Sequence, residues 1–235
     1  MEQLIGYFKD KNVSKVLDVG TGPGHFIEGL QKVFPEADFT GVDPDENSLD
    51  EARVNHPYAN FEKMGGEALT FDDDSFDIAT ISMALHHLTD VQKTLSEMKR
   101  VVKSDGWIIV KELYADNLNS AQEVHKQMHH FRSRIDRIKG IVHNESFKRQ
   151  EILDQIKAAG FEVELTFDYT RSAKALNNSE IAERKAKLYT ALDSIKGCKE
   201  YDELAQEIPK LEAALEKHGF QMASRLVVVA RVEKT

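Results

Sequence analysis

The chain alternates between short apolar runs and stretches whose apolar residues recur at helical spacing. The apolar runs predict buried strands, and the intervening stretches predict amphipathic helices. The predicted strands span residues 15–20, 38–43, 60–64, 76–83, 106–113, 161–169 and 224–232. Strands that alternate with helices form a parallel sheet that is covered by helices on both faces. The pattern therefore predicts an α/β fold with a seven-stranded parallel sheet.

Two helical segments interrupt this alternation. The first carries an apolar stripe from residue 118 to 138 at three- and four-residue steps, as on one long helix. The second lies between the last two predicted strands and carries two such stripes, at 181–195 and 204–215, which predict a helical hairpin. We therefore expect helical insertions at about 114–145 and 176–218.

The composition is that of an ordinary globular protein, with 41% hydrophobic and 30% charged residues. No composition break marks a boundary, so we expect residues 1–235 to form a single domain. The lone cysteine, Cys198, excludes an internal disulfide and fits a reducing compartment. Since the chain has neither a signal-peptide pattern nor a bilayer-spanning apolar run, we expect a cytoplasmic protein with no membrane partner. The formal net charge of −9 also disfavours nucleic acid as a partner.

The stretch VLDVGTGPGHF, residues 16–26, places three glycines directly after the first predicted strand. Gly20, Gly22 and Gly24 allow a sharp turn and a close approach of the backbone to a ligand. Some 20 residues further on, the second strand ends in Asp43, where a carboxylate can accept both hydroxyls of a ribose. Together these features predict a nucleoside site.

Two details of this stretch separate it from a dinucleotide-binding turn. The third glycine of the Gly-x-Gly-x-x-Gly pattern is replaced by His25, and Asp18 lies just before the first glycine. A buried carboxylate at Asp18 would repel a pyrophosphate, but it could accept hydrogen bonds from an ammonium group. The predicted cofactor therefore carries an amino acid and a ribose without phosphate, which fits S-adenosylmethionine.

At this point the sequence resembles the class I S-adenosylmethionine-dependent methyltransferases, especially the small-molecule branch that includes ubiquinone and menaquinone biosynthesis enzymes. The stretch VLDVGTGPGHF matches the first motif of the family, and GVDPDENSLDEAR matches the second. GGEALTFDDDSFDIATISMALHHL is similar to its Gly-Asp-Ala segment and fourth motif. In VVKSDGWIIVKE, Ser104 and Asp105 replace the Pro and the first Gly of the Lys-Pro-Gly-Gly turn. The resemblance covers residues 14 to about 113 well and the stretch FKRQEILDQIKAAGFEVE more loosely.

The resemblance implies a Rossmann-like sheet whose seventh strand is antiparallel and inserted beside the sixth. It also implies that Glu67 reaches the adenine amino group, that the Ala68 amide meets the ring, and that Ser82 and Met83 border the methionine moiety. Glu67 stands where the family has Asp. The cofactor-binding residues that we expect are Asp18, Gly20, Thr21, Gly22, Gly24, Asp43, Pro44, Glu67, Ala68, Ser82 and Met83. With this topology the 176–218 insertion emerges at the carboxyl edge of the sheet, so we expect both insertions to form a substrate lid or a dimer contact.

Methyl transfer is an in-line displacement, in which alignment matters most and a general base helps only a hydroxyl or phenol acceptor. The candidate catalytic residues are His86, His87, Tyr114 and His129. His125 and His129 have a spacing that could hold a metal. The pattern lacks the glutamate of zinc proteases, and the strand ends offer no thiolate, so we expect no metal site.

These observations favour a methyltransferase that acts on a small-molecule acceptor, and a homodimer is compatible with them. The fourth motif, ISMAL, lacks the Asn/Asp-Pro-Pro-aromatic signature of enzymes that methylate amino groups of adenine or glutamine, which favours O- or C-methylation. Two alternatives stay open. One is a non-catalytic S-adenosylmethionine-binding sensor or partner protein, and the other is an NAD-dependent oxidoreductase, which His25 and Asp18 disfavour.

Overall fold

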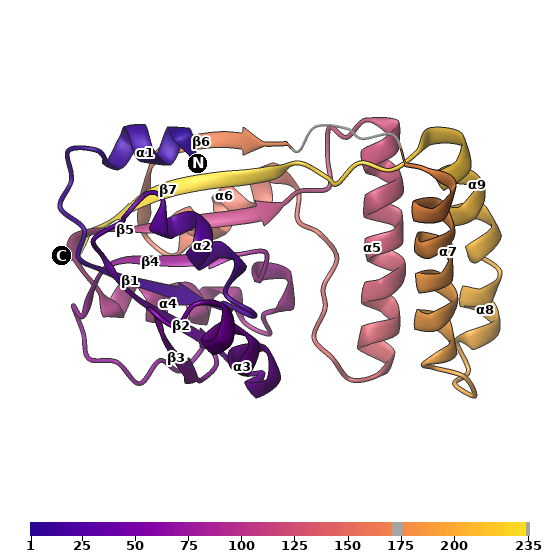
Figure 1. The fold of residues 1–235 in the computed structure, drawn as a ribbon, viewed down its shortest axis with the longest axis horizontal. Coiled ribbons are helices and arrows are strands. Elements are labelled where there is room, and N and C mark those ends of the chain that lie inside the picture. The colour runs from indigo at the N-terminus through magenta and orange to yellow at the C-terminus, as the bar shows by residue number, and fades with distance from the viewer. Residues whose placement is uncertain (171–175, 234–235) are drawn as a thin grey trace.

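A computed structural model describes residues 1–170 and 176–233, and its centre is a seven-stranded sheet in the order β3-β2-β1-β4-β5-β7-β6 (Figure 1). The strands are β1 Lys15–Val19, β2 Asp38–Asp43, β3 Asn60–Lys63, β4 Phe76–Ser82, β5 Val102–Leu113, β6 Phe161–Tyr169 and β7 Arg225–Val232. The first five strands in chain order pair in parallel. Strand β7 lies between β5 and β6 and is antiparallel to both, as in the register pairs Trp107 with Arg231 and Phe161 with Val232. The predicted fold class is confirmed.

Helices cover both faces of the sheet because successive strand residues point to opposite sides. Ile108 packs with helices α4 and α6 in one hydrophobic cluster, and its neighbour Ile109 packs with α1, α2 and α3 in the other. These helices are α1 Glu2–Phe8, α2 His25–Gln31, α3 Glu46–Asn55, α4 Val91–Val101 and α6 Arg149–Ala158. The chain changes direction across the sheet between β1 and β4, and ligands of such sheets bind in the crevice at the carboxyl ends of these strands.

The remaining α-helices form a separate layer beyond one end of the sheet (Figure 1). They are α5 Ser120–Ile138, α7 Asn178–Asp193, α8 Tyr201–Ala205 and α9 Ile208–His218. This layer has a hydrophobic cluster of its own, in which Phe131 and Ile135 of α5 pack with Leu188 and Leu192 of α7. The two helical insertions predicted from the sequence thus pack against each other.

Three details differ from the sequence expectations. The second arm of the hairpin is two helices, α8 and α9, and Pro209, which lacks an amide hydrogen, lies in the first turn of α9. Strand β5 begins at Val102, four residues before the predicted 106. The sequence reasoning did not predict α1, whose Phe8 meets the ring of Trp107 edge-on at 5.6 Å between centroids. Among the described residues, no helix is long and apolar enough to cross a membrane.

Candidate active site

The glycine turn lies where β1 and β4 meet at their carboxyl ends. Gly20 has φ +66°, and a Cβ there would lie 2.7 Å from the Cβ of Ala84, which follows β4. A Cβ at Gly22 would instead meet nothing within 4 Å, because this residue faces open space. The turn therefore needs glycine for close packing on one side and leaves its backbone bare toward a ligand on the other.

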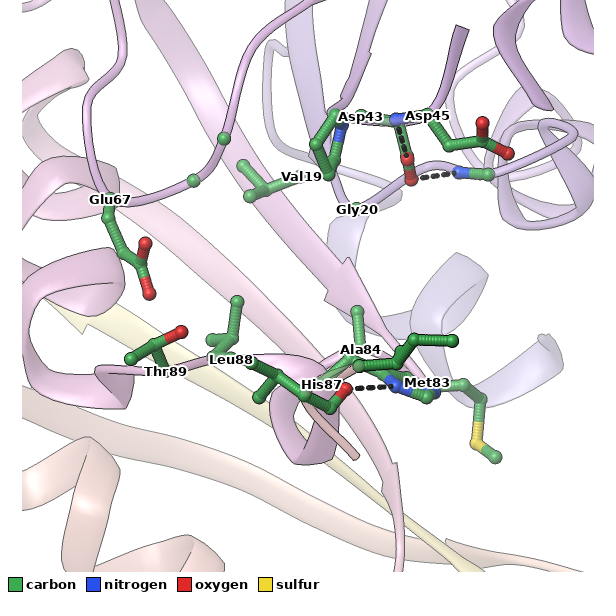
Figure 2. Close-up of a pocket in the computed structure, with 16 residues that line it drawn as sticks. Val19, Gly20, Asp43, Asp45, Glu67, Met83, Ala84, His87, Leu88 and Thr89 are labelled. Atoms are coloured by element: carbon green, nitrogen blue, oxygen red, sulfur yellow. Dashed lines mark hydrogen bonds between the residues drawn. The ribbon is translucent and has the colours of Figure 1, made fainter. Parts of the chain in front are cut away.

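Asp43, the last residue of β2, is fixed against this turn by two backbone amides. Gly22 N donates to its Oδ2 at 2.8 Å, and Asp45 N donates to its Oδ1 at 2.9 Å (Figure 2). Each carboxylate oxygen can accept more than one hydrogen bond, so both remain able to accept from a ligand. The carboxylate is thus held in one orientation at the edge of a cavity.

This first cavity, of about 630 Å³, lies between the glycine turn and the segment after β4. Among the predicted cofactor residues, it is lined by Gly20, Gly22, Asp43, Pro44, Glu67 and Met83. Glu67 accepts a hydrogen bond from Asp90 N, the N-cap residue of α4, at 3.0 Å, and its side chain lies toward Thr89 in Figure 2. Ala68 is exposed and donates its amide to Gly65 O at 3.3 Å, and it does not line the cavity.

A second cavity, of about 340 Å³, adjoins the first at the glycine turn. Asp18 lies at its floor with 1% of its surface exposed and accepts a 2.5 Å hydrogen bond from Thr80 Oγ1. Burial raises the pKa of Asp18 to about 6, against the opposing effect of the Thr80 hydrogen bond. Lys111 and Arg225 line the same cavity, so it combines one buried acid with two cations.

The remaining predicted cofactor residues lie at or near the second cavity. Thr21 and Ser82 line it, whereas Gly24 is buried and forms the left-handed N-cap of α2 at φ +83°. Met83 lines both cavities and has φ +59°, a conformation that costs a non-glycine residue energy and that often occurs at functional sites. Its amide donates to Lys111 O at 2.8 Å, which holds this conformation in place.

The four candidate catalytic residues lie in different surroundings. His87 lines the first cavity, and its Nδ1 donates to Val142 O at 3.2 Å. Its pKa is lowered, mainly because neighbouring side chains displace water from the ring. Tyr114 is 7% exposed, packs in the main hydrophobic cluster and lines neither cavity.

His86 and His129 lie together, away from both cavity linings, in a group that also includes His143. Burial and nearby histidines lower the pKa of His129 to about 2, so its ring stays neutral near pH 7 and is a weak base on its own. His125, which the sequence paired with His129, instead accepts a hydrogen bond from Ala223 N at 3.1 Å.

Sequence reasoning missed Lys111 and Arg225 as site residues. Lys111 is paired with Ser82 at the carboxyl end of β4, and Arg225 is the first residue of β7. Whether these side chains face the second cavity depends on how the strands pair. The signal that the sequence did offer is that both residues lie near the ends of predicted strands.

Residues 17–110 match a family model described as a methyltransferase domain. The ubiquinone/menaquinone biosynthesis C-methyltransferase UbiE of Campylobacter jejuni is 32% identical over 103 residues, which cover 42% of this chain and 44% of that protein. An uncharacterized methyltransferase of Bacillus subtilis, YcgJ, is 35% identical over 106 residues, which cover 43% of this chain and 41% of YcgJ. The solved structure of YcgJ has the same fold, with a TM-score of 0.62 at 19% identity over 100% of both chains.

The matched segment runs from β1 into β5 and contains the glycine turn and Asp43. The fold and this segment resemble those of class I S-adenosylmethionine-dependent methyltransferases, as the motifs predicted. Residues 17–110, less than half of the chain, match the methyltransferase domain family and resemble the quinone-biosynthesis methyltransferases. S-adenosylmethionine is the cofactor that this family implies. The chain spans about half the length of the curated relatives that it matches, for example 41% of YcgJ and 51% of the demethylmenaquinone methyltransferase of Thermotoga maritima.

Proposed function

We propose that this chain transfers a methyl group from S-adenosylmethionine to an oxygen or carbon atom of a small-molecule acceptor. The observation that carries this proposal is the mixed charge of the second cavity, where Asp18 lies with Lys111 and Arg225. An amino-acid tail carries an ammonium and a carboxylate, and these opposite charges match the acid and the two cations. We assign the ammonium to Asp18 and the carboxylate to Lys111 and Arg225.

The first cavity fits the nucleoside half of the same molecule. Two backbone amides orient the carboxylate of Asp43, which leaves acceptor capacity for the two ribose hydroxyls. Glu67 lines the far part of this cavity and is our candidate for the adenine amino group. The bare backbone at Gly22 lines both cavities, so a ligand can pass from one to the other along it.

A dinucleotide fits these two cavities less well. The pyrophosphate of NAD would lie along the glycine turn, close to the buried carboxylate of Asp18, and would be repelled by it. The charges of the second cavity favour a ligand that is cationic near Asp18. The NAD-dependent alternative is therefore the weaker one.

The bound cofactor would supply a sulfonium methyl group, and this chain's contribution would be alignment of the acceptor with it. Met83 and Ser82 border the second cavity, so we place the reacting methyl near them. His87 is the predicted catalytic residue that lines a cofactor cavity, and we retain it as the candidate for positioning the acceptor or accepting its proton. An acceptor that is already ionised needs no base.

We further propose that the layer of α5 and α7–α9 is the substrate lid or a dimer contact beside it. It lies beyond the carboxyl ends of β4 and β5 (Figure 1), and residues 176–218 line neither cofactor cavity. Replacing 176–218 by a short linker should therefore lower acceptor affinity or change the oligomeric state and leave cofactor affinity unchanged. If acceptor affinity and oligomeric state both stayed the same, the lid proposal would be wrong.

Calorimetry with S-adenosylmethionine, S-adenosylhomocysteine and NAD tests the cofactor. We expect binding of both sulfur nucleosides, and binding of NAD alone would overturn the proposal. Release of S-adenosylhomocysteine across a panel of phenols, quinols and amines then separates an enzyme from a non-catalytic sensor. The panel begins with quinols because the names of several relatives refer to quinone biosynthesis.

A further inference from the structure

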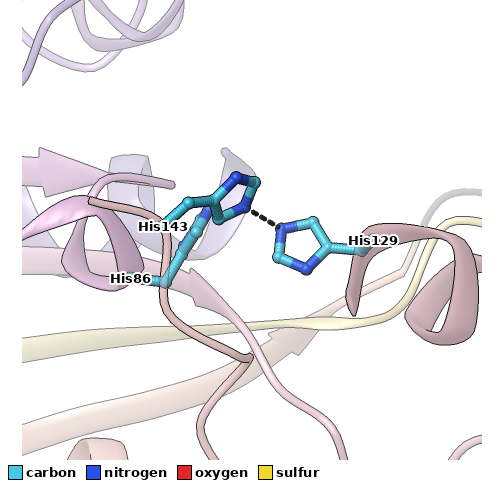
Figure 3. Close-up of side chains that lie close together, drawn as sticks. All are labelled: His86, His129 and His143. Atoms are coloured by element: carbon cyan, nitrogen blue, oxygen red, sulfur yellow. Dashed lines mark hydrogen bonds between the residues drawn. The ribbon is translucent and has the colours of Figure 1, made fainter. Parts of the chain in front are cut away.

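Three histidines from separate parts of the chain converge at the junction between the sheet and the helical layer. His86 lies in the short 3-10 helix Leu85–His87 after β4, His129 lies on α5, and His143 lies in the segment between α5 and α6. One ring nitrogen from each lies within 4.8 Å of the other two, and the Nε2 atoms of His129 and His143 are 3.1 Å apart (Figure 3). His86 and His143 are buried, and His129 is partly buried.

Each ring is oriented by a hydrogen bond at its other nitrogen. Glu112 Oε1 lies 3.0 Å from His86 Nδ1, and Glu112 itself is fully buried. Asp136 Oδ2 lies 2.9 Å from His143 Nδ1. A carboxylate on Nδ1 fixes that nitrogen as the donor, so the Nε2 atom carries a free lone pair.

The third ring has a partner of a different kind. Ser146 Oγ lies 3.4 Å from His129 Nδ1. A hydroxyl can donate to this nitrogen or accept from it, so His129 can take either tautomer. Without a metal, its Nε2 proton can be donated to His143 Nε2. With a metal, that proton moves to Nδ1 and is donated to Ser146, which frees Nε2 as a ligand.

We propose that the Nε2 atoms of His86, His129 and His143 bind one divalent metal ion of the zinc class. Three imidazoles, two of which have carboxylate partners, are typical of sites for Zn²⁺ and for related ions that prefer nitrogen ligands, rather than for Mg²⁺ or Ca²⁺. With bonds of about 2.0–2.1 Å in a tetrahedron, the nitrogens would lie about 3.3 Å apart. One pair is already close to that separation, and the others must approach by at most about 1.5 Å from the observed limit of 4.8 Å.

The number of protein ligands is a further property of the cluster that suits a metal. Three protein ligands leave a fourth position open, as in zinc sites that hold water or a substrate atom.

A metal at this site would lie next to the wall of the first cavity. Its binding does not depend on the proposed reaction. His87 and Val142, the neighbours of His86 and His143 in the chain, both line the first cavity and are joined by a hydrogen bond. A metal held between His86, His129 and His143 would therefore clamp α5 and the following segment onto the cavity wall. We expect the metal to raise cofactor affinity through this clamp.

The test uses the full chain without an affinity tag, stripped with a chelator and titrated with Zn²⁺ against a chromophoric chelator. We expect one equivalent of tight binding, and loss of that equivalent in His129→Gln and His143→Gln. The exposed His218 at the end of α9 provides the matched control, since His218→Gln should bind as the parent does. Asp136→Asn, which keeps every ligand, should weaken binding by about 10–100-fold.

A direct measurement on the unaltered protein keeps the proposal falsifiable if a buried variant fails to fold. X-ray absorption of the zinc-loaded chain should show three imidazole nitrogens, and Co²⁺ should give the intense visible bands of a tetrahedral site. Absence of tight binding, equal binding by parent and His143→Gln, or an oxygen-only octahedral ion would overturn the proposal. None of these readouts needs S-adenosylmethionine, so failure of the proposed function would be seen separately by calorimetry.

Discussion

Substitution of Asp18 by Asn should stabilise the ligand-free fold and weaken cofactor binding at the same time. The carboxylate is 1% exposed, and its pKa is raised from 3.8 to about 6 by burial. Because the folded chain holds this proton more tightly than the unfolded chain does, ionisation disfavours the folded state. The penalty is absent below pH 3.8, grows as the pH rises, and is complete above pH 6.

The size of this penalty follows from the shift of the pKa. A rise from 3.8 to about 6 corresponds to about 3 kcal/mol at pH 7.5, and most of it is lost by pH 4. Asn keeps an oxygen that can accept the hydrogen bond from Thr80, but its amide hydrogens bring a desolvation cost of about 1 kcal/mol or more. We therefore expect Asp18→Asn to be about 1–2 kcal/mol more stable than the parent at pH 7.5.

Urea denaturation at several pH values tests this reasoning. When the unfolding free energies of the two proteins are subtracted, the contributions of all other titrating groups cancel. When the pH is lowered from 7.5 to 4, the unfolding free energy of the parent should rise by about 2 kcal/mol relative to that of Asp18→Asn. By calorimetry the variant should lose about 1.5–3 kcal/mol of S-adenosylmethionine binding, since the ammonium loses its charged partner. Asp38→Asn, at an exposed acid at the start of β2, is the control. A pH-independent stability difference, or unchanged cofactor affinity, would refute the role given to Asp18.

Three further substitutions test the other parts of the site. Asp43→Ala should weaken S-adenosylmethionine binding by about 1.5–3 kcal/mol in calorimetry, and unchanged affinity would show that the ribose is held elsewhere. Arg225→Gln should weaken S-adenosylmethionine about tenfold or more and leave 5′-methylthioadenosine, which has no carboxylate, nearly unaffected. Equal losses for the two ligands would contradict the assignment of the tail. Leu192→Ala should lower the unfolding free energy by about 2–5 kcal/mol in urea and keep cofactor affinity, because Leu192 packs in the separate helical cluster. A loss of cofactor affinity in a folded variant would show that packing in the helical cluster affects the cofactor cavities.

The cofactor half of the site could be predicted because its residues are local in sequence. Asp18 lies near the end of β1, the glycines form the turn that follows it, and Asp43 ends the next strand, so strand order alone brings them together. The spacing of apolar runs likewise placed all seven strands. The contact between Ala68 and the adenine ring stays a prediction, and in the structure its amide donates to Gly65 O within its own turn.

The other half depends on side-chain packing between distant segments, which periodicity does not encode. The sequence pattern offered Tyr114 at the end of β5, but the side chain packs into the main core. It offered His125 as the partner of His129 by helical spacing, whereas His129 contacts His143 across a turn. No local pattern specifies where the segment after α5 folds back, so the contact of His143 with His129 could not be predicted from the sequence.

The site concentrates two unfavourable features. Buried Asp18 favours protonation, and Met83 holds a positive φ where the two cavities meet. Both residues lie at the carboxyl ends of adjacent strands, close to the segment that carries His86 and His87. A cofactor ammonium would offset the cost of ionised Asp18 and so stabilise the carboxyl end of β1. A metal on the three histidines would fix α5 and the segment after it. Cofactor and metal should then each raise the other's affinity, because both act on the same short segment between β4 and α4.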